Sequence, residues 1–117
     1  MLAPHDQELL HAIAASYSQG LTPDLSTERM VVKAILAHLS EIEPGRSVEL
    51  RIPPYAAIQL VAGHTHRRGT PSAVVETSAR TLVALAHGDL TWAEAVTSGA
   101  LIAGGERSDL SRLFPLD

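Results

Sequence analysis

The sequence predicts one α/β domain of the α+β type, with helices packed on one face of a mainly antiparallel sheet. Two observations lead to this prediction: a helical apolar period in residues 1–45, and a change to strict alternation at residues 47–52. At 117 residues the chain is near the commonest size of a single domain. We therefore expect one domain over residues 1–117, with N-terminal helices in 1–45 and the main core in 46–116.

Two helices are predicted before the sheet. In the first, apolar residues recur at i, i+3, i+4 and i+7, namely Leu10, Ile13, Ala14 and Tyr17. Asp6 suits its N-cap and Gly20 its end. The second helix is expected to begin near Ser26 and to end before Pro44-Gly45.

Three strands are predicted next. Residues 47–52 alternate apolar with polar, as in a strand with one wet face, and Pro53-Pro54 ends the run. Residues 55–62 are almost continuously apolar and predict a more buried strand. After a polar, arginine-rich loop at 63–71, residues 73–76 predict a short third strand. The spacing among these three strands is typical of hairpins, which favours an antiparallel sheet.

The last third of the chain predicts two helices, a strand and a short closing helix. A helical stripe over 79–86 ends at Gly88. Thr91 and Glu94 form a capping box at the start of the next helix, which Gly99 ends. Residues 100–103 read as a fourth strand, and residues 110–114 suit the closing helix. The expected order is therefore ααβββααβα.

Composition excludes several classes of function. The net charge is −4 and Lys33 is the one lysine, which argues against a nucleic-acid or anionic-membrane surface. The absence of cysteine excludes disulfides and thiolate chemistry. No signal peptide or membrane-spanning stretch is indicated, so we expect a cytoplasmic protein without stable membrane insertion. With 3% aromatic residues, the core must be aliphatic, and such a core can be either filled or hollow.

Residues 77–115 carry a family resemblance. Four features in order resemble a sterol carrier (non-specific lipid-transfer) domain. They are a helix ending in Gly88, the Leu-Thr-x-x-x-Ala start of the next helix, the Ser98-Gly99 break and the apolar strand after it. Similar segments of the bacterial branch are found at residues 51–59, 68–71, 74–77 and 109–111. The resemblance covers residues 46–116 well and residues 1–45 by their helical character.

The resemblance implies a non-catalytic binding module with a hydrophobic tunnel between sheet and helices, holding a sterol, a fatty acyl chain or another apolar molecule. The residues expected to line this tunnel are Ile58, Leu60, Val74, Leu82, Leu85, Trp92, Val96 and Ile102. For each of them, ordinary core packing is the alternative. Arg67, Arg68 and Gln59 are candidates for polar contacts with a ligand, because guanidinium groups bind carboxylate and phosphate. An exposed loop, or an arginine pair with Glu76 from Arg68 or Arg80, is the alternative for this segment.

No catalytic or metal-binding group is predicted, and no cofactor. His64 and His66 are two apart, but a closed metal site needs three or four ligands. Glu76 and Glu94 do not form a convincing acid–base pair, because Glu94 already has a capping role. No nucleophile elbow, phosphate loop or dinucleotide fingerprint is present in the sequence.

Two other readings stay open. The same fold could serve as a structural or interaction module with a filled core, including a homodimer. It could also be an enzyme-associated domain, although His5, His11 and His38 form no clear set of metal ligands. The N-terminal helices could cover the sheet, close a pocket, or exchange between subunits.

Overall fold

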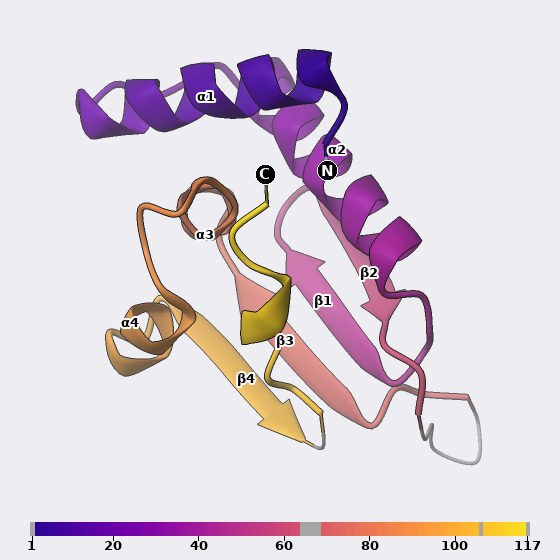
Figure 1. The fold of residues 1–117 in the computed structure, drawn as a ribbon. Coiled ribbons are helices and arrows are strands. Elements are labelled where there is room, and N and C mark those ends of the chain that lie inside the picture. Colours follow the sequence, from indigo (N-terminus) through magenta and orange to yellow (C-terminus); the bar gives the residue numbers. More distant parts are fainter. Residues whose placement is uncertain (1, 64–68, 106, 117) are drawn as a thin grey trace.

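The computed structural model describes residues 2–63, 69–105 and 107–116, and it places helices beside a four-stranded mixed sheet (Figure 1). The elements follow one another in the predicted order, and the closing helix is a 3-10 helix, η1. Their bounds are α1 Pro4–Ser18, α2 Leu25–Ile42, β1 Val48–Ile52, β2 Ala56–Leu60, β3 Ala73–Thr77, α3 Ala79–His87, α4 Trp92–Thr97, β4 Leu101–Gly105 and η1 Ser111–Leu113.

The strand order is β2-β1-β3-β4. β1 pairs antiparallel with β2, and β3 pairs antiparallel with β4, whereas β1 and β3 are parallel. The predicted α+β class and the mainly antiparallel sheet are confirmed. The hairpin-like spacing holds for β1 and β2 only, because β3 crosses to the far side of β1 instead of pairing with β2.

Ser47 holds this crossover together. Its backbone N–H and its hydroxyl both donate to the Val61 carbonyl, at 3.1 and 2.6 Å. Its carbonyl accepts from the Ala73 N–H at 3.1 Å and from the Ser72 hydroxyl at 3.2 Å. The start of β1 is thereby bonded to the end of β2 on one side and to the start of β3 on the other. Ser47 is fully buried, so these bonds are shielded from water.

A close backbone contact accompanies the Ser47 junction. Gly45 has φ +153°, and a Cβ built on it would lie 2.1 Å from the Val61 carbonyl carbon. Val61 itself has φ 67°, a region that β-branched residues rarely adopt. The chain therefore needs glycine at position 45 to let residue 61 approach the start of β1.

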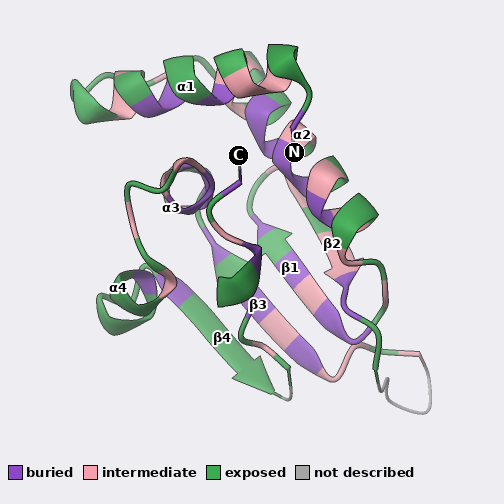
Figure 2. Cartoon of the chain, in the orientation of Figure 1, coloured by how far each residue is buried: buried purple, intermediate pink, exposed green. Residues whose placement is uncertain are grey.

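One face of the sheet is covered by helices and the other is open (Figure 2). The helix face carries buried residues at alternate positions, such as Val48, Leu50 and Ile52 of β1. On the opposite face, here called the open face, Arg51 and Glu76 are exposed. The predicted burial of the second strand is wrong, because β2 is an edge strand in which Leu60 alone is fully covered.

The N-terminal helix α1 packs against α3 and against the second helix, α2. Leu10, Ile13 and Ala14 are its buried residues. The Glu28 carboxylate accepts hydrogen bonds from the hydroxyls of Tyr17, in α1, and of Tyr55, beside β2. This shared carboxylate joins α1, α2 and the β1–β2 turn. Burial and the Glu28 hydrogen bond raise the pKa of Tyr17, and the Glu28 hydrogen bond and burial raise the pKa of Tyr55.

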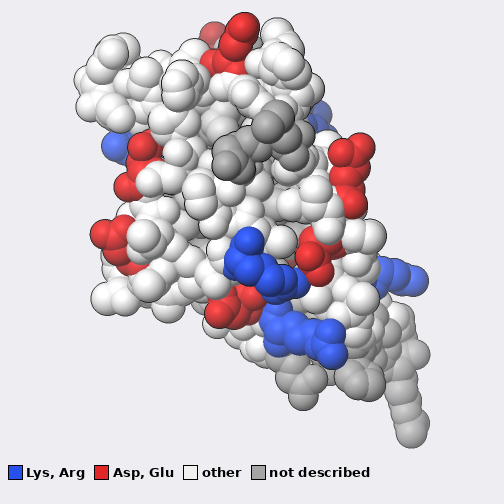
Figure 3. Space-filling model, viewed as in Figure 1, with Lys and Arg blue, Asp and Glu red and all other residues white. Residues whose placement is uncertain are grey.

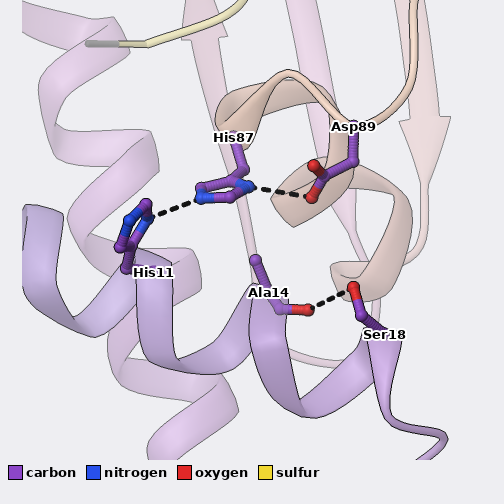
Figure 4. A network of polar contacts seen from close by, with 5 residues as sticks. All are labelled: His11, Ala14, Ser18, His87 and Asp89. Atoms are coloured by element: carbon purple, nitrogen blue, oxygen red, sulfur yellow. Dashed lines mark hydrogen bonds and ion pairs between the residues drawn. The ribbon is translucent and has the colours of Figure 1, made fainter.

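A second set of polar contacts ties α1 to the end of α3 (Figure 4). His11 Nδ1 lies 2.6 Å from His87 Nε2, and His87 Nδ1 lies 2.9 Å from Asp89 Oδ2. The same view shows the Ser18 hydroxyl donating to the Ala14 carbonyl within α1. The two histidine contacts lie at the surface, and they tie α1 to the chain where it leaves α3.

Short sequence motifs predict the ends of the helices to within a few residues. The Thr91–Glu94 capping box is confirmed, with both of its hydrogen bonds formed. Ser78 caps α3, and Gly88 ends it in the left-handed conformation. One predicted start is wrong: α1 begins at Pro4, before the expected cap Asp6. The second helix begins near Ser26 as expected, at Leu25, because Asp24 caps it through the Thr27 N–H.

The crossover can be tested by adding a methyl group at position 45. Gly45→Ala forces a Cβ into the Val61 backbone, so we expect a loss of about 3 kcal/mol or more in unfolding free energy. Gly99→Ala is the matched control: its φ is +78° and its Cβ would meet nothing within 4 Å. That variant should lose only the cost of left-handed backbone, about 1–2 kcal/mol. Urea denaturation measures both, and equal losses would contradict the role given to Gly45.

Candidate functional site

An apolar pocket of about 330 Å³ is formed by the end of α3, the start of α4 and the C-terminal segment. Two stretches of chain line it, one from the α3–α4 corner and one from the C-terminal segment. The lining residues are Leu85, Gly88, Leu90, Thr91, Trp92, Ala93, Ser111, Phe114 and Pro115. A volume of this size is at the lower end of the range for small-molecule sites.

The α3–α4 corner forms one wall of the pocket. The Ala84 carbonyl accepts from the N–H groups of Gly88, Asp89 and Leu90, which closes the end of α3. Gly88 has φ +91°, a conformation that glycine adopts without strain, and the chain turns there. The Thr91 hydroxyl then accepts from the Glu94 N–H at 3.1 Å and starts α4. Trp92, as the first residue of α4, is held at the pocket by this cap.

The C-terminal segment forms the facing wall. Leu110, Leu113 and Leu116 are buried and anchor it to the core. The Leu116 N–H donates to the Ala86 carbonyl of α3 at 2.8 Å, which fixes the segment beside that helix. Between these anchors, the Phe114 ring stacks on Trp92, with ring centroids 6.4 Å apart and planes inclined by 17°.

The structure divides the predicted tunnel residues among several places. Leu85 and Trp92 line the pocket together. Leu82 is buried in the core beneath α3, and Leu60 and Ile58 lie on the helix face of β2.

The other three predicted tunnel residues lie apart from this pocket. Val74 and Ile102 lie on the open face, because the pleat of β3 and β4 turns alternate residues away from the helices. Ile102 is 68% exposed and borders a separate hollow of about 280 Å³ beside Glu76 and Ser78. Val96, on α4, is 46% exposed.

The candidate polar residues are also spread out. Gln59 lies on the open face of β2, where its side-chain oxygen accepts from Arg46 Nε at 3.3 Å. Arg67 and Arg68, like His64 and His66, lie outside the described residues. Arg80 lies over the ring of Tyr17, 5.4 Å from its centroid, which differs from the pair with Glu76 considered above.

Several pocket residues were not anticipated. Leu90, Ala93, Ser111, Phe114 and Pro115 line the pocket and are not among the predicted tunnel residues. Trp92 and Phe114 account for two of the four aromatic residues in the chain. Aromatic side chains tend to pair, and the sequence has few of them. This was the one sequence signal that could have predicted a contact between Trp92 and Phe114.

Carboxylates border the pocket without lining it. Glu94 Oε1 accepts from the Thr91 N–H, and Asp109 Oδ1 accepts from the Ser111 N–H, each at 2.9 Å. The backbone hydrogen bond from Thr91 holds the pKa of the Glu94 carboxyl below its usual value, and the bond from Ser111 does the same for Asp109. Both groups are therefore ionised at neutral pH.

A larger hollow of about 610 Å³ lies beside the start of α2, lined by Leu25, Ser26, Arg29, Met30, Pro54 and Tyr55. Leu25 is 73% exposed and Met30 is 54% exposed. This hollow differs from the pocket at the α3–α4 corner in that a charged side chain, Arg29, lines it.

Among the described residues, no three histidines or acids come close enough together to hold a metal ion. The helices in the same part of the chain include none that is long and apolar enough to cross a membrane.

Comparison with known protein families gives a match. The family described as bacterial SCP ortholog matches residues 24–116, which is more than three quarters of the chain and leaves α1 outside the match. No curated protein matches the sequence. The matched range contains the complete sheet, the α3–α4 corner and the C-terminal segment. The chain therefore belongs to the bacterial branch of the sterol carrier protein-like domains.

Proposed function

We propose that this protein is a non-catalytic binding domain for an apolar small molecule or lipid, and that the pocket at the α3–α4 corner holds its ligand. The observation that carries the proposal is an apolar pocket whose walls include the stacked pair Trp92 and Phe114. Membership of the sterol carrier-like family supports the same class of function.

The size of the pocket indicates the kind of ligand. A cavity of about 150 Å³ is enough to hold benzene, and this pocket is about 330 Å³. It suits a medium-length alkyl chain, or one apolar part of a larger lipid. Affinity would come from removing apolar surface from water, at about 0.8 kcal/mol for each buried CH₂ group.

The chemistry of the lining supports binding rather than catalysis. Its polar side-chain groups are the hydroxyls of Thr91 and Ser111 and the indole N–H of Trp92, and the Thr91 oxygen is engaged as the cap of α4. Activation of a hydroxyl nucleophile needs an adjacent base, and Glu94 instead accepts from the Thr91 backbone.

Trp92 is the only tryptophan and lines the pocket, so it reports binding directly. We expect a series of 1-alkanols to shift its emission, with affinity rising about fourfold for each added CH₂ until the pocket is full. Delipidated protein should be titrated, and the lipid removed from it identified by mass spectrometry. Failure of every alkanol to bind, with no lipid retained on purification, would overturn the proposed function.

A filling variant locates the site. Ala93→Leu places a larger side chain in the pocket wall and should weaken alkanol binding at least about fivefold. Ala37→Leu adds the same side chain at an exposed position of α2 and should leave binding unchanged. Equal affinities for the two variants would exclude this pocket as the ligand site.

A second candidate function is self-association, and the edge of the sheet favours it. β4 ends the strand order, and its residues Leu101–Gly105 carry no charge. Ile102 projects from it with 68% of its surface exposed. Natural edge strands usually carry charges or other features that prevent pairing with a second chain. A second copy could therefore pair along β4 and extend the sheet across a twofold axis.

Analytical ultracentrifugation over a wide concentration range tests this candidate. Pairing along β4 predicts a dimer that Ile102→Lys weakens, because a lysine on an edge strand opposes pairing. Val96→Lys is the control, since Val96 is also exposed but lies on α4. A monomer at every concentration, or equal effects of the two variants, would rule out the β4 dimer.

A further inference from the structure

The charges around the pocket point to a preference among apolar ligands, and this inference rests on the proposed function. None of the nine residues that line the pocket has a charged side chain. The polar side-chain atoms of the lining are the hydroxyls of Thr91 and Ser111 and the indole N–H of Trp92. The Thr91 oxygen accepts from the Glu94 N–H, which leaves its own proton to donate to a ligand oxygen. Ser111 is exposed at the opposite wall and can donate or accept.

Two carboxylates border this lining. Glu94 and Asp109 are hydrogen-bonded to the backbone of the lining residues Thr91 and Ser111, so neither can move far from the pocket without breaking that bond. An anionic group entering the pocket would therefore meet fixed negative charge.

The basic residues that adjoin the pocket in the chain, His87 and Arg112, already have polar partners. Arg112 follows Ser111 in the chain, but its guanidinium lies 2.9 Å from a Glu43 carboxylate oxygen and 3.4 Å from the Asp109 carbonyl. His87 lies between Asp89 and His11 (Figure 4). The basic side chains on the face shown in Figure 3 gather mostly in its lower half, whereas acidic ones are spread along both sides.

We propose that the pocket selects apolar ligands with an uncharged polar end, such as a hydroxyl or an ester carbonyl, over ligands that end in a carboxylate or phosphate. A neutral oxygen can accept from the Thr91 or Ser111 hydroxyl. A carboxylate would lose hydration and gain no cation, and it would be repelled by Glu94 and Asp109. The ligand class is thus a neutral lipid or alcohol rather than a free fatty acid.

The test compares 1-decanol, methyl decanoate and sodium decanoate at neutral pH and low salt, with Trp92 emission as the readout. We expect both neutral ligands to bind at least about tenfold more tightly than decanoate. Because decanoate is also better hydrated than decanol, the source of the difference needs two further measurements. Added salt should tighten decanoate binding selectively, since it screens repulsion from the bordering carboxylates.

The second measurement uses a variant that removes the charges of Glu94 and Asp109 and keeps their hydrogen bonds to the backbone. In Glu94→Gln with Asp109→Asn, the side-chain carbonyl can still accept from the Thr91 and Ser111 N–H groups. We expect this double variant to bind decanoate about three- to tenfold more tightly and decanol as before. Glu8→Gln with Glu41→Gln makes the same change in net charge at exposed positions of α1 and α2, and should change neither affinity. Thermal melting checks that both double variants are folded.

The outcomes separate the two proposals. Decanoate binding as tight as decanol, or a decanoate affinity that neither salt nor the Glu94/Asp109 variant raises above the control, overturns the preference and leaves the binding function standing. If no decyl ligand binds, the proposed function itself fails.

Discussion

The hydrogen bonds of Ser47 are the constraint on which the rest of the fold depends. One buried residue joins the end of β2 to the start of β1 and the start of β1 to the start of β3. This junction makes β1 and β3 parallel and moves β2 to the edge. It works because Gly45 lets Val61 approach within a distance that any Cβ would prevent.

With β3 beside β1, the chain that follows β3 returns over the helix face as α3. Leu82, Leu85 and Ala86 of α3 are buried there, and the C-terminal segment is bonded to the end of the same helix through Leu116 and Ala86. The pocket lies at the margin of this layer, where α3 ends at Gly88 and the chain turns into α4. A site at such a corner is open to ligands, and hydrogen bonds from the Thr91 and Ser111 N–H groups hold its bordering carboxylates in place.

The order of the elements and the caps could be predicted because they depend on neighbours in the sequence. Helical periodicity, the Thr91–Glu94 capping box and the glycine after α3 act over a few residues. The strand pairing could not be predicted from spacing, since the short strand at 73–77 fits beside either earlier strand. For the same reason the predicted tunnel residues lie in several places: Leu85 and Trp92 line one pocket, together with Phe114 from a distant segment.

The sequence by itself determined the class of fold, the positions of helices and strands, the family and an aliphatic core without cysteine chemistry. The tertiary structure decided which strands pair, which face of the sheet each residue takes and where the pocket lies. Alternation along a strand identifies two faces, but only the pairing of β1 with β3 and the covering helices decide which one is buried. Val74 and Ile102, apolar residues on the open face, show the difference.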